Sequence, residues 1–308
     1  MMQKHIPVML DEVIKALAPA KGKVYVDATF GNGGYSEAIL NKAECKVVAI
    51  DRDPNVCARA DEFKKLYGNR FEFLSGCFAD IADLVKEKVD GIVFDIGVSS
   101  MQLDEAERGF SYAKEAKLDM RMSCTGVSAF DLVNKLSEKE LADLLYNYGE
   151  ERKSRQIASK IVEARKLNPI QTTTELAGIV HQVLYKKNGA PDPATRTFQA
   201  LRIAVNDELR QLEQGLINGL KILNEGGRMV VVTFHSLEDR IVKNFFAQNT
   251  SKKVHVSRYG NNKNVSKSAF SECSKAIAPS ASEVVQNSRA HSAKLRYAIK
   301  SMEVNDDE

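Results

Sequence analysis

The chain has 308 residues, 44% of them hydrophobic and 28% charged, and its net charge is +3. This length suggests two domains, or one domain with a large insertion, and the hydrophobic fraction supplies an ample core. No apolar run approaches the roughly 18 residues that span a membrane, and the N-terminus lacks an apolar signal region. We therefore expect a cytoplasmic protein. The five cysteines are scattered and form no cluster with histidine, which favours reduced thiols over disulfides or a metal site.

After a short expected helix at residues 11–17, a strand, a glycine-rich turn and a helix are predicted between residues 24 and 40. The turn contains Gly31, Gly33 and Gly34, and glycine lets the backbone pass close to a ligand where a Cβ atom would collide. A second strand, residues 45–50, leads into Asp51, 20 residues after Gly31. From that spacing an acidic side chain reaches the hydroxyls of a ribose.

Two classes of cofactor use such a unit. A dinucleotide site requires a third glycine, but Ser36 stands there, and Asp27 places an acid before the turn where a phosphate would be repelled. S-adenosylmethionine carries a sulfonium, an ammonium and a ribose but no phosphate, so the pattern favours it over NAD. The alternative is a turn whose glycines serve packing alone.

Further strands are predicted at 71–74, 89–95 and 228–234. Phe78 follows the third strand, where its ring would lie either against an adenine or in the core. Asp51, Asp95 and His235 follow strand ends, as does Asp27, and ligands of open parallel sheets lie beyond those ends. His235 is either a site residue or a core histidine, and Ser236 is expected to cap the next helix rather than to act as a nucleophile.

The alternation of strand and helix stops near residue 104. Helical segments are predicted at 129–136, 138–148, 153–166, 174–185 and 195–206, with the last continuing through 207–223. Capping boxes at Ser137–Glu140 and Thr172–Glu175 begin two of them. We therefore predict an all-helical insertion at 104–206 within a cofactor-binding domain of residues 1–103 and 207–308.

The C-terminal region is basic. Residues 251–300 have a net charge of +8, which leaves −5 for the rest of the chain. The basic residues are Lys252, Lys253, Arg258, Lys263, Lys267, Lys275, Arg289, Lys294, Arg296 and Lys300. Such a segment suits contact with a phosphate backbone, although a solvated basic surface is the alternative. Residues 294–299 alternate like an edge strand, and the acidic tail 303–308 is expected to be disordered.

Taken together, these segments resemble one family: the S-adenosylmethionine-dependent methyltransferases that modify N4 of a cytidine in 16S rRNA, the RsmH or MraW type. The resemblance rests on residues 5–12, 27–34, 49–54, 95–104, 108–112, 118–122, 148–152, 193–203 and 233–240. They include Asp-Ala-Thr-Phe-Gly-Asn-Gly-Gly at 27–34 and Thr-Phe-His-Ser-Leu-Glu-Asp-Arg at 233–240.

The resemblance implies an α/β fold, a Rossmann-like class I methyltransferase sheet with an inserted all-helical substrate-recognition domain. It implies cofactor contacts at Gly33, Gly34, Tyr35, Asp51, Phe78, Asp95 and Gln102. The family commonly has histidine where Tyr35 stands, which matters little if that contact is made by the backbone. The family also usually reads Asn-Pro-Arg-x-Arg-Ser where this chain has Ser288 and His291, a change that would weaken contact with RNA phosphate.

The implied reaction is methyl transfer to an exocyclic amine in the decoding region. Such an amine is a poor nucleophile, so the enzyme must orient it and accept its hydrogen bonds. We expect Asp95, Ser99 or a nearby carbonyl to accept the N4 protons, and His235 to shape the nucleotide pocket. The Asp/Asn-Pro-Pro-aromatic tetrapeptide of DNA amino methyltransferases is absent after the fourth strand.

The expected partner is 16S rRNA, within a small ribosomal subunit rather than as naked RNA, because the target base must be turned out of its surroundings. A homodimer is left open. Five arginines in or beside the insertion are candidates for clamping phosphates or for internal ion pairs: Arg108, Arg121, Arg152, Arg196 and Arg202. Rival interpretations are a dehydrogenase, a DNA or small-molecule methyltransferase, and a non-catalytic RNA-binding assembly factor.

Overall fold

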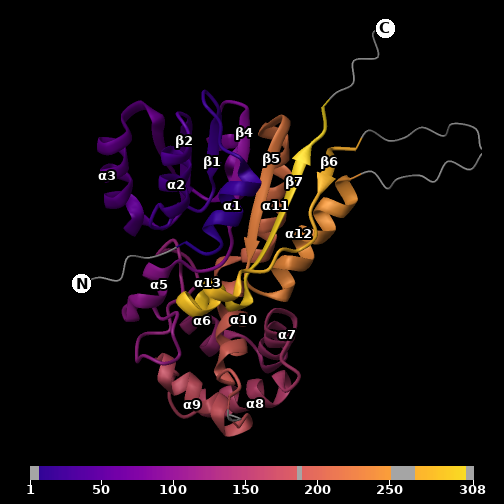
Figure 1. Cartoon of the computed structure of the whole chain (residues 1–308). Coiled ribbons are helices and arrows are strands. Elements are labelled where there is room, and N and C mark those ends of the chain that lie inside the picture. The colour runs from indigo at the N-terminus through magenta and orange to yellow at the C-terminus, as the bar shows by residue number, and fades with distance from the viewer. Residues whose placement is uncertain (1–6, 186–188, 251–267, 303–308) are drawn as a thin grey trace, which may run out of the picture. The chain divides into compact units, whose positions relative to one another are not determined.

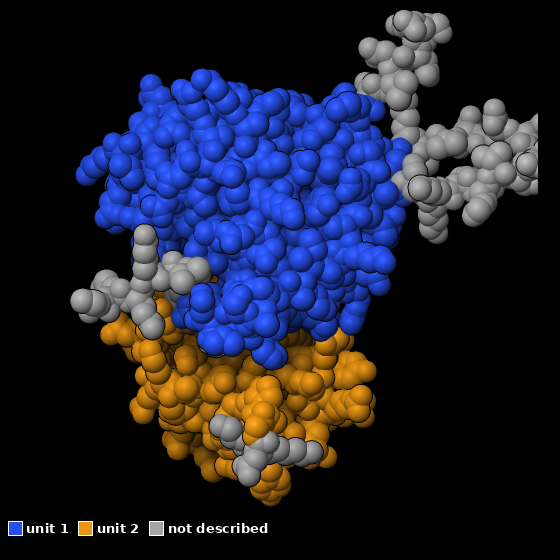
Figure 2. Space-filling view, viewed as in Figure 1, with its two compact units in different colours: residues 1–97, 209–308 blue, residues 98–208 orange. Residues whose placement is uncertain are grey.

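The computed structural model describes residues 7–185, 189–250 and 268–302. The chain divides into two compact units: unit 1 comprises residues 1–97 and 209–308, and unit 2 comprises residues 98–208 (Figure 2). Within the described ranges, no helix has both the length and the apolar character needed to cross a membrane.

Unit 1 is built on a seven-stranded sheet with the strand order β3-β2-β1-β4-β5-β7-β6 (Figure 1). The strands are β1 Val24–Asp27, β2 Lys46–Asp51, β3 Phe71–Ser75, β4 Val89–Asp95, β5 Leu223–Thr233, β6 Phe270–Cys273 and β7 Lys294–Lys300. Strands β1 to β5 pair in parallel with one another, whereas β7 runs antiparallel to both β5 and β6. The α/β fold predicted from the sequence is confirmed.

Helices cover both faces of this sheet. Those of unit 1 are α1 Leu10–Leu17, α2 Gly34–Lys42, α3 Cys57–Tyr67, α4 Ile81–Leu84, α11 Glu208–Ile222, α12 Ser236–Asn249 and α13 Ala281–Gln286. On one face Leu216 of α11 and Phe246 of α12 join a buried cluster with Ile92 of β4. On the other face α1 lies so close that a Cβ atom on Gly91 would come 2.7 Å from Leu17 Cδ1. The central strands are apolar throughout because both of their faces are buried.

Three details differ from the sequence prediction. The helix expected to continue through residue 207 ends at Asn206, because Asp207 is left-handed (φ 52°), a conformation that aspartate tolerates. Strand β5 begins at Leu223 rather than at residue 228. Strand β7 lies between β5 and β6, so it is not an edge strand, and β6 forms the edge instead. Alternation shows that one face of a strand is more polar, but it does not reveal the strand's neighbours.

Unit 2 is helical and has its own core. Its helices are α5 Ser100–Asp104, α6 Ala129–Lys135, α7 Glu138–Gly149, α8 Ser154–Arg165, α9 Thr173–Val183 and α10 Ala194–Asn206. Leu141, Ile157 and Leu176 come from three of these helices and are buried in one cluster. The predicted capping boxes that begin α7 and α9 are both present.

Candidate active site

The glycine-rich turn between β1 and α2 is packed tightly by the protein itself. Gly33 has φ +81°, and a Cβ atom there would lie 2.5 Å from Cζ of Phe63. A Cβ atom on Gly34 would lie 2.1 Å from Cγ of Pro7. Larger residues would therefore displace protein neighbours at both positions, so packing alone already requires the two glycines.

Asp27, at the end of β1, binds residues on both sides of this turn through hydrogen bonds. It is fully buried, and its Oδ2 accepts hydrogen bonds from Ser36 Oγ (2.7 Å) and Ser36 N (3.1 Å). Its Oδ1 accepts one from Thr29 N (3.3 Å). Burial raises the pKa of Asp27 to about 6, against the opposing effect of the Ser36 hydroxyl. Ser36, which stands where a dinucleotide site would have its third glycine, thus binds the buried Asp27 carboxylate. The spacing of the glycines in the sequence does not reveal this role.

Asp51 is fixed at the end of β2 with acceptor capacity remaining. Its Oδ2 accepts a hydrogen bond from Gly31 N (2.7 Å), and its Oδ1 accepts one from Asp53 N (2.9 Å). Burial raises the pKa of Asp51, and these two backbone donors oppose that rise. Each carboxylate oxygen offers about two acceptor positions, so a pair of ribose hydroxyls can still donate to this side chain.

Asp95, at the end of β4, carries a buried carboxylate oxygen. Its backbone N donates to Thr29 Oγ1 (2.8 Å), which ties the ends of β1 and β4 together. Its Oδ1 has no hydrogen-bond partner within the residues that the structure describes. Burial, followed by the charges of Asp27 and Glu238, raises the pKa of Asp95 well above its usual value. Leaving such an atom unpaired costs about 1–3 kcal/mol, so Oδ1 keeps the capacity to accept a further hydrogen bond.

His235 follows β5 and is itself the cap of α12, so the prediction that Ser236 caps this helix is wrong. The His235 Nδ1 faces Glu238 N (3.4 Å), and its Nε2 lies 2.8 Å from Glu238 Oε1. Glu238 is fully buried, and its Oε2 accepts hydrogen bonds from Phe234 N and His235 N. Both imidazole nitrogens therefore face Glu238. Sequence reasoning missed Glu238, although an acid three residues after a helix cap is the capping-box signal.

Tyr35 and Phe78 both have protein partners. The Tyr35 hydroxyl donates to the carbonyl oxygen of Val8, and burial raises the pKa of this phenol well above its usual value. Phe78 is half-buried, with its ring 5.8 Å from that of Phe94 in an edge-to-face arrangement. The Tyr35 ring is thus directed at the N-terminal segment, and the Phe78 ring packs on the core but keeps some exposed area.

Ser99 and Gln102 lie in unit 2, four and seven residues after Asp95 along the chain. Together they form the capping box of α5: Ser99 Oγ accepts from Gln102 N (3.2 Å), and Gln102 Oε1 accepts from Ser99 N (3.0 Å). The box fixes the start of α5 directly after the strand that carries Asp95.

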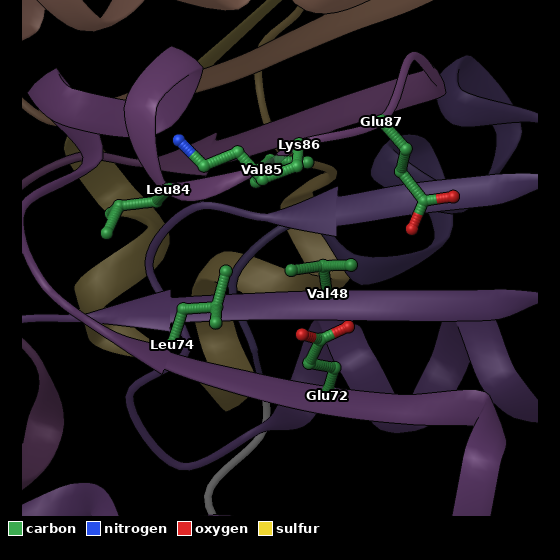
Figure 3. A pocket seen from close by; sticks show the side chains of 7 residues that line it. All are labelled: Val48, Glu72, Leu74, Leu84, Val85, Lys86 and Glu87. Carbon is green, nitrogen blue, oxygen red and sulfur yellow. The ribbon is translucent and has the colours of Figure 1, made fainter.

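A cavity of about 200 Å³ lies elsewhere in unit 1, between β2, β3 and the segment after α4. Val48, Leu74, Leu84 and Val85 form its apolar part, and three charged side chains, Glu72, Lys86 and Glu87, stand around them (Figure 3). The cavity exists because α4 has only four residues and leaves this part of the sheet uncovered. None of the predicted site residues lines it.

Four of the five candidate arginines have partners within unit 2, and Arg196 is one of them because its Nη1 donates to the carbonyl oxygen of Glu150 (3.2 Å). Arg121 pairs with Asp119 (2.6 Å), and Arg202 pairs with Glu208 through two nitrogens at 2.9 Å. The Arg108 guanidinium donates to two backbone carbonyls.

Half of the basic residues in the C-terminal region lie outside the described residues, as does the acidic tail. They are Lys252, Lys253, Arg258, Lys263 and Lys267. The Lys294 and Arg296 side chains bind Asp239, and Lys300 binds carbonyls of Leu220 and Leu223.

Comparison with known proteins places the chain in a family. The chain is 54% identical over 302 residues to the ribosomal RNA small subunit methyltransferase H of Rickettsia conorii, covering 97% of this chain and 98% of that protein. The same values hold for the protein of that name from Rickettsia canadensis. Among solved structures, an rRNA methylase from Streptococcus thermophilus aligns with a TM-score of 0.43 at 10% identity, over 98% of this chain and 99% of that one. Residues 2–301 match the MraW methylase family, and the chain belongs to it.

Proposed function

We propose that this protein transfers a methyl group from S-adenosylmethionine to the exocyclic N4 of a cytidine in the decoding region of 16S rRNA. Membership of the MraW methylase family and the names of relatives at 54% identity support this activity. The structural observation that carries it is the buried Oδ1 of Asp95, unpartnered within the described residues, at the carboxyl edge of the sheet.

The residues at this edge suit S-adenosylmethionine. The charge of Asp51 raises the pKa of Asp27, and the charges of Asp27 and Glu238 raise the pKa of Asp95. A group of acids at this edge favours a cation over a phosphate. We assign the contacts to Gly33, Gly34, Tyr35, Asp51, Phe78, Asp95 and Gln102, with Asp51 accepting hydrogen bonds from the ribose hydroxyls. When bound, S-adenosylmethionine supplies the methyl group as an electrophilic sulfonium.

Asp95 is the group that we assign to the amine of the base. Its Oδ1 accepts a hydrogen bond from N4, orients the nitrogen and takes up the proton that the amine loses on methylation, and burial raises the pKa of this carboxyl group. Ser99 is a second acceptor for the N4 protons. His235 shapes the nucleotide pocket from a fixed orientation, because Glu238 faces both of its ring nitrogens.

The substrate that we propose is the small ribosomal subunit in the cytoplasm, where the target cytidine is accessible before assembly closes around it. An RNA base must leave its stack for the amine to reach a buried methyl donor, and an incomplete particle presents such a base more readily than a duplex.

The deciding experiment supplies labelled S-adenosylmethionine and small subunits from cells that lack the enzyme, then digests the RNA to nucleosides. We expect label in N4-methylcytidine and none in tRNA or DNA controls. Label in another nucleoside would exclude the proposed target but keep the methyltransferase. Cofactor binding without label would favour the non-catalytic assembly factor.

Asp95→Asn provides the test of the site. The amide cannot take up a proton, so kcat at saturating S-adenosylmethionine should fall by about 100-fold or more. The matched control is Asp90→Asn, the same change on the same strand, where Asp90 binds Lys23 and Val24 N at the opposite end. Full activity in Asp95→Asn would remove Asp95 from the mechanism.

A further inference from the structure

Unit 2 exposes a group of cations where α8 begins. It consists of Arg152, Lys153, Arg155 and Arg196, referred to below as the α8 patch. The first three are consecutive or nearly so along the chain, and Arg196 belongs to α10. All four are exposed, and the Arg196 side chain is 58% exposed. Helices α7, α8 and α10 all belong to this unit (Figure 1).

Packing of α10 against the end of α7 brings Arg196 to this patch. A Cβ atom on Gly149 would lie 2.7 Å from the carbonyl oxygen of Arg196, so the two helices are in contact there. Arg196 Nη1 donates to the carbonyl oxygen of Glu150 (3.2 Å) and lies 4.0 Å from Glu151 Oε2. Glu150 and Glu151 directly precede Arg152, so the four cations occupy one small region of the surface.

The positive charge of this region is only partly compensated. Glu151 is buried, and its Oε1 already accepts a hydrogen bond from Lys153 N (2.8 Å). Arg152 and Arg155 have no acidic partner in the part of the chain that the structure describes. With Glu150 and Glu151 counted, the region keeps a net charge of +2.

Helix stability does not explain this placement. Cations near a helix N-terminus interact unfavourably with its dipole, and α7 and α9 follow the usual preference with Glu138, Glu140 and Glu175 in their first turns. The first turn of α8 has no acidic residue and contains Arg155. Arg108, Arg121 and Arg202 are bound inside the unit, whereas Arg152 and Arg155 extend into solvent.

We propose that the α8 patch binds the phosphate backbone of the rRNA substrate. This inference rests on the proposed function and assigns the RNA contact to particular side chains. An aromatic ring distinguishes RNA from an acidic protein as the partner: Tyr146 is 61% exposed and lies one turn before Glu150, whose carbonyl binds Arg196. An exposed tyrosine beside cations provides a surface on which an unpaired base can stack.

The test compares Arg152→Ala/Arg155→Ala with the control Lys139→Ala/Lys160→Ala, which removes the same charge from exposed positions of α7 and α8. Both pairs are measured for KM and kcat on small subunits, and for binding to a protein-free rRNA fragment at several salt concentrations. For the patch variant we expect a KM about tenfold higher and a salt-dependence slope smaller by about 2, one for each lost phosphate contact. The control pair, kcat and the dissociation constant of S-adenosylmethionine should stay near their wild-type values.

Equal effects in the two pairs, or unchanged RNA binding by the patch variant, would overturn the proposal. Loss of activity on subunits with intact binding to the protein-free fragment would assign the patch to a ribosomal protein and also overturn it. Failure of the proposed function is seen separately, as a wild-type protein that binds S-adenosylmethionine but methylates nothing. The fragment-binding measurement would then still decide whether the patch contacts RNA.

Discussion

Burial of Asp27, at the start of the glycine-rich turn, makes the stability of the folded protein depend on pH. Its pKa is raised from 3.8 to about 6 because the carboxylate is buried, so the native state holds this proton more tightly than the unfolded state does. Between those two pH values the native protein binds more protons, and stability must fall as the pH rises. The free-energy cost of ionising the buried Asp27 is absent below about pH 4 and reaches its full value above about pH 6.

Replacement of Asp27 by Asn removes this titration and keeps an acceptor for Ser36. The free energy of unfolding of the Asn variant, relative to wild type, should therefore rise by about 3 kcal/mol between pH 4 and pH 7. Urea unfolding of both proteins at a series of pH values measures this difference. Parallel pH profiles would show that Asp27 keeps an ordinary pKa in the folded chain.

His235 illustrates what a local pattern reveals and omits at the residue scale. Its position after a strand was sufficient to mark it as a candidate site residue. The sequence left open whether the imidazole faces a substrate or the protein, since this depends on where the Glu238 side chain points. In the structure Glu238 faces both ring nitrogens, and this arrangement favours a fixed, shaping role over proton transfer.

At the scale of elements, the glycine-rich turn requires two different properties of Gly33, and their effects on stability can be measured separately. Gly33 needs both a positive φ and the absence of a side chain, whereas Gly22 has φ +74° with nothing within 4 Å of an added Cβ atom. Comparing alanine substitutions at Gly22 and Gly33 therefore separates the energetic cost of backbone strain from the cost of a steric clash.

Gly22→Ala should cost about 1 kcal/mol for the left-handed backbone alone. Gly33→Ala should cost about 3 kcal/mol, because Phe63 and Phe30 must also move away from the new methyl group. Chemical denaturation of both variants gives the two values. Equal losses would mean that the Phe63 ring yields freely and that the close approach is unimportant.

The neighbours of β7 show the limit of sequence reasoning about elements. Its alternation correctly predicted a strand over residues 294–299. The strand lies inside the sheet because Phe270–Cys273 pairs with its outer side, and that pairing joins segments more than 20 residues apart. Four residues with little apolar character give no local signal, so the edge strand was missed.

At the scale of the whole molecule, each unit has a core of its own. Residues 98–208 bury a continuous apolar cluster drawn from α6 to α10, which is a core suited to a domain of ordinary size. We therefore expect a fragment of residues 98–208 to fold alone, with strongly helical circular dichroism and one cooperative thermal transition. It should not bind S-adenosylmethionine, since Asp51 and Asp95 lie outside it.

Leu145→Ala in the same fragment serves as the control for a native core. Leu145 is fully buried, so its truncation should destabilise a packed fragment by about 2–5 kcal/mol. A fragment without a cooperative transition, or one that is indifferent to this substitution, would show that the helical unit requires the rest of the chain.

The sequence by itself determined the class of fold, the acids at the strand ends and the family, because hydrophobic periodicity, turn glycines and long motifs are local properties. Only the tertiary structure decided which of those polar groups retain capacity for a ligand. Asp27 is bound by Ser36, His235 faces Glu238, and four of the five arginines bind partners inside the helical unit. Of the three strand-end aspartates, Asp95 keeps a buried carboxylate oxygen that has no hydrogen-bond partner within the described residues. Hydrogen bonds and burial depend on which distant segments meet, and no local pattern encodes that.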